Sequence, residues 1–102
     1  MDERLQSEYD FLNYSKDHYI KTNVTRDEII EFSDKIIKIN RFGFKQERNI
    51  IITDKAVYNL KKTSLKRRID IKAIQGITLA KTMDEFVIHC SGDDYDYYSN
   101  AI

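Results

Sequence analysis

Short apolar runs separated by polar residues follow one another along most of the chain, a pattern typical of β-strands. The strongest pair lies in residues 36–53, where an isoleucine-rich run at 36–39 is followed, after a turn, by three isoleucines at 50–52. β-Branched residues favour strands. Residues 36–53 are therefore predicted to form a β-hairpin with Gly43 in its turn.

Further apolar runs follow this hairpin at regular intervals. The expected strands cover residues 56–60, 65–69, 77–80, 85–90 and 95–98, and the clearest turn covers residues 91–94. With the two strands of the hairpin this makes about seven strands at a spacing of roughly 8–12 residues, typical of a small antiparallel barrel or sandwich.

The N-terminal residues have a different pattern. Leu5, Tyr9 and Leu12 recur near helical spacing, which predicts a helix over residues 2–19 and a loop over 21–24. This helix is strongly aromatic. We favour the interpretation that its aromatic face packs on the protein's own sheet, and the alternative is a helix that docks to a partner.

The segment between this helix and the hairpin is ambiguous. Thr25 and Glu28 have the spacing of a helix-capping box, but the apolar residues after them also fit a strand. A turn at 33–35 is expected to precede the hairpin. We therefore divide the chain into an N-terminal helical extension, residues 1–24, and a β domain, residues 25–102.

Charge is unevenly distributed along the chain, although its formal net value is zero. Residues 1–34 carry 4 basic and 9 acidic side chains, residues 35–68 carry 11 and 2, and residues 69–102 carry 2 and 6. An excess of nine positive charges in the middle third indicates a local cationic patch between two acidic regions.

The length and the cysteine content narrow the class of protein. With 102 residues the chain forms one domain. It has one cysteine, Cys90, which fits a reducing compartment. No apolar run is long enough to cross a bilayer, and no signal peptide is expected, since Asp2, Glu3 and Arg4 follow Met1. We expect a cytoplasmic protein.

Catalytic chemistry is poorly supported by the sequence. His89 and Cys90 are adjacent, so in a strand they point to opposite faces and do not form a dyad. Neither the histidines nor the aspartates at 93, 94 and 96 have the spacing of a zinc or calcium site. No phosphate-loop motif is present. We expect no enzymatic activity, no cofactor and no metal.

The turn of the predicted hairpin is both cationic and aromatic. Its basic candidates are Lys38, Arg41, Lys45 and Arg48. Phosphate groups bind to convergent cationic donors and free backbone N–H groups, which such a loop supplies. Phe42 is a candidate for contact with a membrane interface, whereas Phe44 is expected to turn into the core.

A second group of basic residues follows in the next strands. Its candidates are Lys61, Lys62, Lys66 and Arg68. In a strand Lys66 and Arg68 share one face, and Arg67 takes the other. This group either widens an anionic footprint, binds a protein or is simply solvated. Nucleic-acid binding is not expected, since no known motif is present and the net charge is zero.

The order of these segments carries a family resemblance over about residues 32–98. The basic hairpin is followed by TDKAVYNL, LKRRI, QGIT and FVIHC, and this succession resembles the tail-homology-1 domain of class I myosins. The resemblance implies a pleckstrin-homology-like, seven-stranded antiparallel barrel that binds anionic phospholipids. It also implies a C-terminal helix that closes the barrel, and here we expect this helix to be truncated or absent.

The resemblance also suggests which residues bind lipid. In such domains a lysine near the end of the first strand and an arginine early in the second contact the headgroup, which correspond to Lys38 and Arg48, with Arg41 and Lys45 as helpers. The predicted function is binding of an anionic phospholipid, a phosphoinositide, which tethers a cytoskeletal or signalling assembly to membrane. The alternative is a protein-interaction module of the same fold that docks through its N-terminal helix or basic face.

Overall fold

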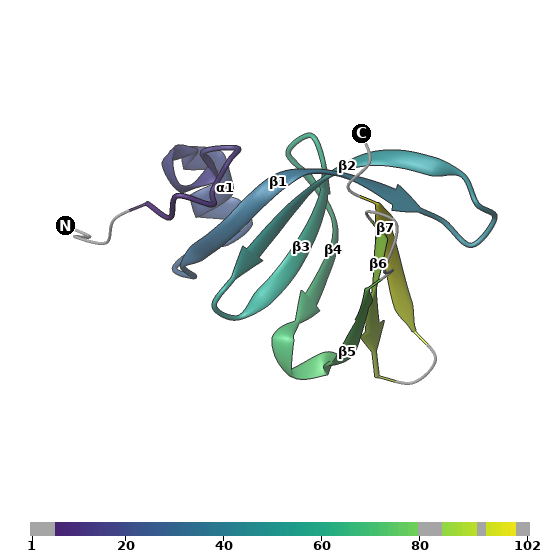
Figure 1. Cartoon of the computed structure of the whole chain (residues 1–102). Helices are drawn as coiled ribbons and strands as arrows, with labels where there is room; N and C mark the ends of the chain where they lie inside the picture. Colours follow the sequence, from purple (N-terminus) through teal and green to yellow (C-terminus); the bar gives the residue numbers. More distant parts are fainter. Residues whose placement is uncertain (1–5, 80–84, 92–93, 100–102) are drawn as a thin grey trace.

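The computed structural model describes residues 6–79, 85–91 and 94–99. It contains an antiparallel sheet of seven strands in the order β4-β3-β2-β1-β7-β6-β5, which curls into a half-barrel (Figure 1). The strands are β1 (Ile30–Ile39), β2 (Lys45–Thr53), β3 (Ala56–Lys61), β4 (Ser64–Asp70), β5 (Ile74–Leu79), β6 (Glu85–Cys90) and β7 (Tyr95–Ser99). The predicted mainly β, pleckstrin-homology-like fold with seven antiparallel strands is confirmed.

Strand β1 joins the two halves of the sheet. It pairs with β2 from Ile30 opposite Thr53 to Ile39 opposite Lys45. On its other edge only residues 37–39 pair with β7. In Figure 1 the strands β1 to β4 form one wall and β5 to β7 the other. The walls are also joined by a short 3₁₀ turn, η2 (Ile71–Ala73), between β4 and β5.

Both faces of the sheet formed by β1, β2 and β3 are covered, which explains the unbroken isoleucine run in β2. Ile50 belongs to a core on the inner face of the half-barrel, and Ile51 belongs to a core on the outer face. The buried residues of the inner core are Ile36, Ile50, Val57, Ile69, Ile88, Cys90 and Tyr98. Those of the outer core are Tyr14, Ile20, Ile30, Ile51, Ala56, Tyr58 and Leu60.

The N-terminal residues cover the outer face, and their structure differs from the prediction. They contain a 3₁₀ turn, η1 (Tyr14–Lys16), and one short helix, α1 (His18–Asn23). The helix predicted over residues 2–19 is wrong for residues 6–17, which form turns, one bridge to β1 and η1, and the loop predicted over 21–24 is wrong for residues 21–23, which lie in α1. The expected packing of an aromatic side chain on the sheet is confirmed for Tyr14, which lies in the outer core.

Asp10 explains why a helix does not form here. Its carboxylate accepts hydrogen bonds from the backbone N–H groups of Tyr14 (3.1 Å) and Ser15 (2.9 Å) and from the hydroxyl of Ser33. An aspartate that binds backbone N–H groups in this way competes with helical hydrogen bonding. The backbone around it pairs with β1 instead, where the N–H of Phe11 donates to the carbonyl of Ser33 at 3.0 Å.

Two other local predictions are corrected by the same contacts. The turn expected at 33–35 is wrong, because these residues lie inside β1, with Ser33 opposite Ile51. The ambiguous segment 25–32 becomes a turn followed by strand from Ile30. The capping box does not form, because the carboxylate of Glu28 instead accepts hydrogen bonds from Thr53 and Tyr58.

The inner face of the half-barrel is open on one side. A hollow of about 520 Å³ enters it there, lined by apolar side chains of both walls, among them Phe32, Ile77 and Phe86. The described residues end with β7, so the C-terminal helix expected to be truncated or absent lies outside them, as do residues 92 and 93 of the turn predicted at 91–94.

Asp10 gives the first testable prediction. Replacing it by alanine removes the acceptor for three buried or half-buried donors. We therefore expect Asp10→Ala to lower the free energy of unfolding by about 2–3 kcal/mol in urea denaturation. Asp27→Ala, at an exposed carboxylate in the neighbouring turn, is the matched control and is expected to change it by less than about 0.5 kcal/mol. Equal losses in both variants would contradict this role of Asp10.

The same carboxylate makes stability depend on pH. Burial acts to raise the pKa of Asp10, but hydrogen bonds from Ser15, Ser33 and the backbone outweigh it and hold this pKa below its ordinary value. A lowered folded-state pKa stabilises the protein above the unfolded-state pKa, and this contribution is lost as the pH falls through the folded-state value. The difference between wild type and Asp10→Ala should therefore shrink in urea titrations below about pH 4.

Candidate functional site

The β1–β2 loop is held in shape by one side chain. The Asn40 carboxamide oxygen accepts from the backbone N–H groups of Phe42 (2.9 Å) and Phe44 (3.0 Å), and the Gly43 N–H donates to the Asn40 carbonyl at 2.9 Å. Gly43 has a φ of 84°, which is unfavourable for residues with a side chain. Local hydrogen bonds therefore fix the shape of this loop.

This loop presents both phenylalanines to solvent. Phe42 is 77% exposed and Phe44 is 68% exposed. The expectation that Phe44 turns into the core is wrong, because the loop begins before Phe44 and strand pairing resumes only at Lys45. The exposed position of Phe42 agrees with the prediction. Two large apolar side chains thus project from a loop that also carries Arg41.

The register of the hairpin separates the four basic candidates. Lys38 lies opposite Gln46, and Arg48 lies opposite the buried Ile36. Since side chains alternate along a strand, Lys38 and Arg48 belong to the inner-face positions, whereas Lys45 belongs to the outer-face positions. The Nε atom of Arg48 is buried and has no hydrogen-bond partner among the described residues.

Lys38 and Arg48 line different hollows. Lys38 and Arg41 line a hollow of about 530 Å³ at the end of the half-barrel. We call this the cationic hollow, and its lining is Lys38, Ile39, Asn40, Arg41, Phe42, Arg67, Asp94, Tyr95 and Asp96. Arg48 lines a second hollow of about 270 Å³ together with Lys61 and Lys62 of the second basic group. Lys38 therefore shares its hollow with Arg41 and Arg67, and Arg48 shares its hollow with Lys61 and Lys62.

Arg67 is a basic residue of the cationic hollow that the sequence did not single out. Side chains alternate along a strand, so Arg67 and Arg68 point to opposite faces, as predicted. Arg67 takes the inner face, the face of Ile69. Its Nη1 donates to Asp96 at 2.8 Å, and its Nη2 donates to Asp94. Arg67 lies two residues before the apolar Ile69 and therefore shares its inner face, and this spacing is the sequence signal that could have placed Arg67 there.

The two carboxylates around Arg67 have different environments. Asp96 is buried and also accepts from the Tyr98 hydroxyl at 2.9 Å. Burial and the Asp96 carboxylate both raise the pKa of Tyr98, so its hydroxyl stays protonated as a donor. Asp94 is open to solvent, and its hydrogen bond with Arg67, with a smaller contribution from Lys38, holds its pKa below the ordinary value. Both acids are therefore counter-ions of the hollow.

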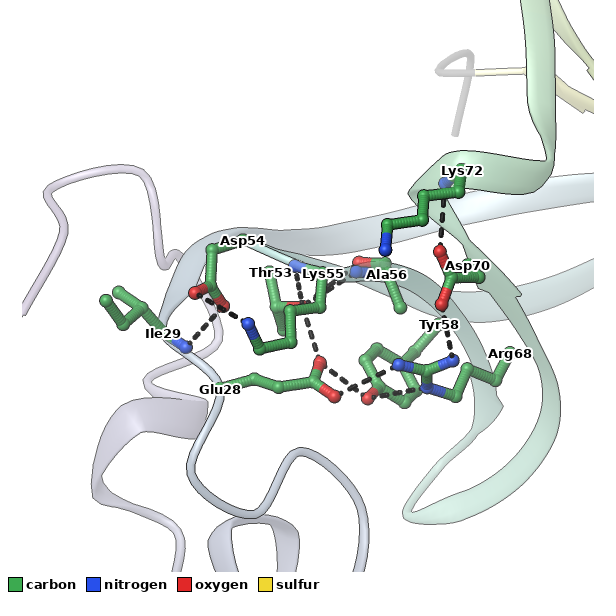
Figure 2. A network of polar contacts seen from close by, with 10 residues as sticks. All are labelled: Glu28, Ile29, Thr53, Asp54, Lys55, Ala56, Tyr58, Arg68, Asp70 and Lys72. Atoms are coloured by element: carbon green, nitrogen blue, oxygen red, sulfur yellow. Dashed lines mark hydrogen bonds and ion pairs between the residues drawn. The ribbon is translucent and has the colours of Figure 1, made fainter.

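Arg68, in contrast, is engaged in a network on the outer face, which Figure 2 shows. Its Nη2 donates to Glu28 at 3.1 Å and its Nε to the Tyr58 hydroxyl at 3.1 Å. Glu28 also accepts from Thr53 at 2.6 Å and from Tyr58 at 2.7 Å. Burial acts to raise the pKa of Glu28, but these hydrogen bonds lower it below the ordinary value.

This network removes one member from the second basic group as a free cation. Arg68 forms ion pairs with Glu28 and, at 3.6 Å, with Asp70, whereas Lys61, Lys62 and Lys66 are exposed. The outer network joins the turn before β1 to β3 and β4. Its role in the structure is to fix that turn.

Signs of other kinds of site are weak. Among the described residues no group of histidine, cysteine and acidic side chains is arranged to hold a metal ion. His89 contacts the Thr78 hydroxyl at 2.7 Å on the surface, while Cys90 is buried, which raises the pKa of its thiol. In the described part of the chain, no helix has the length and apolar character needed to cross a bilayer.

A curled antiparallel sheet with a basic, glycine-containing first hairpin defines a pleckstrin-homology-like domain. A sequence profile of the unconventional myosin tail, described as actin- and lipid-binding, matches residues 8–101. The chain belongs to this family, the tail-homology-1 domains of class I myosins. The predicted resemblance is therefore confirmed, and it extends to most of the N-terminal segment.

Individual relatives are myosin heavy chains. The chain is 32% identical over 77 residues to unconventional myosin-Ih of Homo sapiens, which covers 74% of the chain. It is 32% identical over 93 residues to myosin heavy chain IB of Acanthamoeba castellanii and 28% identical over 94 residues to myosin IA heavy chain of Dictyostelium discoideum, which cover 79% and 78% of it. The chain spans only 8% of the first two relatives and 10% of the third.

The outer network predicts different effects for two neighbouring basic residues. Arg68→Ala leaves the half-buried Glu28 carboxylate without its ionic partner, so we expect a loss of about 1–3 kcal/mol in the free energy of unfolding. Lys66→Ala, at an exposed position in the same strand, should change it by less than about 0.5 kcal/mol. Thermal and urea denaturation measure both, and an unchanged stability in Arg68→Ala would refute the structural role.

Proposed function

We propose that this domain binds anionic, phosphoinositide-bearing membrane through its β1–β2 hairpin and the cationic hollow beside it. The observation that carries the proposal is the placement of two exposed phenylalanines, Phe42 and Phe44, on the loop that borders this hollow. An apolar loop tip beside cations fits a membrane surface, which offers headgroup phosphates above an apolar interior.

The electrostatic part of this proposal rests on Lys38, Arg41 and Arg48. A basic residue near an anionic leaflet contributes about 1 kcal/mol, and the effect falls off within a Debye length of about 8 Å. Several such residues on one hairpin give useful binding that weakens as salt is added. We assign Lys38 and Arg48 to phosphate contact, with Arg41 and Lys45 as helpers at the loop.

The wider role follows from the family. A lipid-binding tail domain of a class I myosin would tether a cytoskeletal assembly to the cytoplasmic side of a membrane, as a peripheral protein. We propose this role for the chain, and we assign it no catalytic step. The division into an extension of residues 1–24 and a domain of 25–102 stays a proposal, in which the extension supports the outer face of the sheet.

A second candidate is a protein-docking module with negligible lipid affinity. The observation that favours it is an exposed aromatic pair on the N-terminal segment, where Tyr9 is 55% and Phe11 56% exposed. Phe11 also packs edge-on against Phe32, with ring centroids 6.0 Å apart. The family description includes actin binding, so a partner could meet this aromatic pair or the exposed lysines Lys61, Lys62 and Lys66.

Liposome co-sedimentation tests the lipid assignment. With vesicles that contain a few per cent phosphoinositide, we expect Lys38→Ala/Arg48→Ala to bind at least tenfold more weakly than wild type, because two cations of about 1 kcal/mol each are lost. The matched control is Lys21→Ala/Lys55→Ala, which removes two exposed lysines away from the hairpin. No binding by wild type at low salt would overturn the membrane proposal and direct attention to Tyr9 and Phe11.

The loop phenylalanines give a separate prediction. Phe42→Ala/Phe44→Ala should weaken vesicle binding roughly fivefold or more, because apolar area no longer enters the interface. Unfolding should be unaffected, since neither side chain is buried. Binding of soluble inositol trisphosphate, measured by calorimetry, should stay unchanged in the single variant Phe44→Ala, because Phe44 does not line the cationic hollow. A parallel loss with the soluble ligand would show that Phe44 shapes the phosphate site and does not insert.

A further inference from the structure

The cationic hollow contains an arginine whose two terminal nitrogens are held by carboxylates of opposite character. Asp96, bound to Nη1 of Arg67, has a side chain that is 1% exposed. Asp94, bound to Nη2, has a side chain that is 54% exposed. Arg67 itself is 30% exposed in its side chain and lines the hollow beside Lys38 and Arg41.

The difference in exposure between the two carboxylates determines which of them a ligand can replace at Arg67. Asp96 cannot leave Arg67 without stranding a buried charge, and the Tyr98 hydroxyl also holds it in place. The Asp94 side chain can move away from Arg67 into the solvent at little cost in free energy, because exposed ion pairs contribute little to stability. Its backbone carbonyl stays bound by the Cys90 N–H at 2.9 Å, so the strand need not move. The outward nitrogen of Arg67 is therefore available to another anion.

We propose that Arg67 is a phosphate-binding residue of the cationic hollow, and that Asp94 is an internal competitor which occupies its outward N–H group when no ligand is bound. This inference rests on the proposed function of the hairpin and adds a residue and a selection rule to it. The ligand chemistry is a phosphate monoester, either on a lipid headgroup or on a free inositol phosphate.

The position of Asp94 also affects a second cation. The hydrogen bond from Arg67 does most to lower the pKa of the Asp94 carboxyl, and the positive charge of Lys38 adds to this effect. One carboxylate thus offsets two of the cations that face the hollow. A ligand has to replace this carboxylate at Nη2, and a phosphate monoester can do so because it carries more negative charge than a single carboxylate.

Selection by charge follows from this competition. A phosphate monoester carries about −1.5 to −2 charges at pH 7, so it displaces one carboxylate favourably. A headgroup with a single net negative charge, such as phosphatidylserine, gains little by the same exchange. Asp94 should therefore suppress binding to weakly charged lipids more than binding to phosphoinositides.

The test compares two variants with the same change in net charge. Asp94→Asn removes the competitor, and Glu31→Gln removes an exposed carboxylate near the start of β1, away from the hairpin loop. We expect Asp94→Asn to bind phosphoinositide vesicles at least threefold more tightly than Glu31→Gln. On phosphatidylserine vesicles the gain should be larger, so that the preference for phosphoinositide decreases.

A second variant assigns the gain to Arg67. Arg67→Lys keeps a positive charge beside the buried Asp96 but has one terminal nitrogen in place of the two that contact Asp96 and Asp94. In the Asp94→Asn background it should cancel most of the gain. Thermal denaturation of each variant checks that the fold is intact. Calorimetry with soluble inositol trisphosphate, without vesicles, should show the same order of affinities, since the same phosphate meets Arg67.

The outcomes separate this inference from the proposed function. If Asp94→Asn binds no better than Glu31→Gln while Lys38→Ala/Arg48→Ala still abolishes vesicle binding, the role of Asp94 and Arg67 is overturned and the membrane function stands. If Asp94→Asn gains affinity for the soluble ligand while neither it nor wild type binds vesicles, the residue assignment stands and the membrane function is overturned. If neither wild type nor Asp94→Asn binds either ligand, both proposals fail.

Discussion

The structure depends on the pairing of β1 on both of its edges. This strand of ten residues pairs with β2 along most of its length and with β7 only at residues 37–39. The first half of its free edge is taken by the N-terminal segment, through the backbone around Asp10. Because one strand serves two walls, the sheet curls there, and the β1–β2 loop and the start of β7 meet at the cationic hollow.

The curl gives strands β1 to β3 two different buried faces, one inside the half-barrel and one under the N-terminal segment, whereas the outer side chains of β4 are exposed. Arg67 and Arg68 show the consequence for charge. Arg68 fixes the turn before β1 through Glu28 and Tyr58, and Arg67 faces the hollow beside Lys38. Two adjacent residues of the same type therefore have separate tasks, one structural and one in binding.

The cationic hollow contains acidic as well as basic side chains, and this affects which ligands the proposed site would bind. Three cations meet two carboxylates there, so the unliganded site is not a bare positive surface. Under the proposed competition, such a site would discriminate against weakly charged surfaces. The exposed phenylalanines of the neighbouring loop add an apolar contribution that free phosphate compounds cannot use. Electrostatic selection and interfacial insertion thus come from adjacent parts of one hairpin region.

The sequence by itself determined the seven strands, the basic hairpin and the family, because alternation, β-branched runs and turn residues are local properties. The assignment of Lys38 and Arg48 to lipid contact came from the family pattern and stays a prediction. Only the tertiary structure decided that Asp10 binds backbone groups in place of a helix, that Phe44 stays outside, and that Arg67 is placed against Asp94 and Asp96. These features depend on contacts between residues far apart in the chain, and such contacts have no local signature.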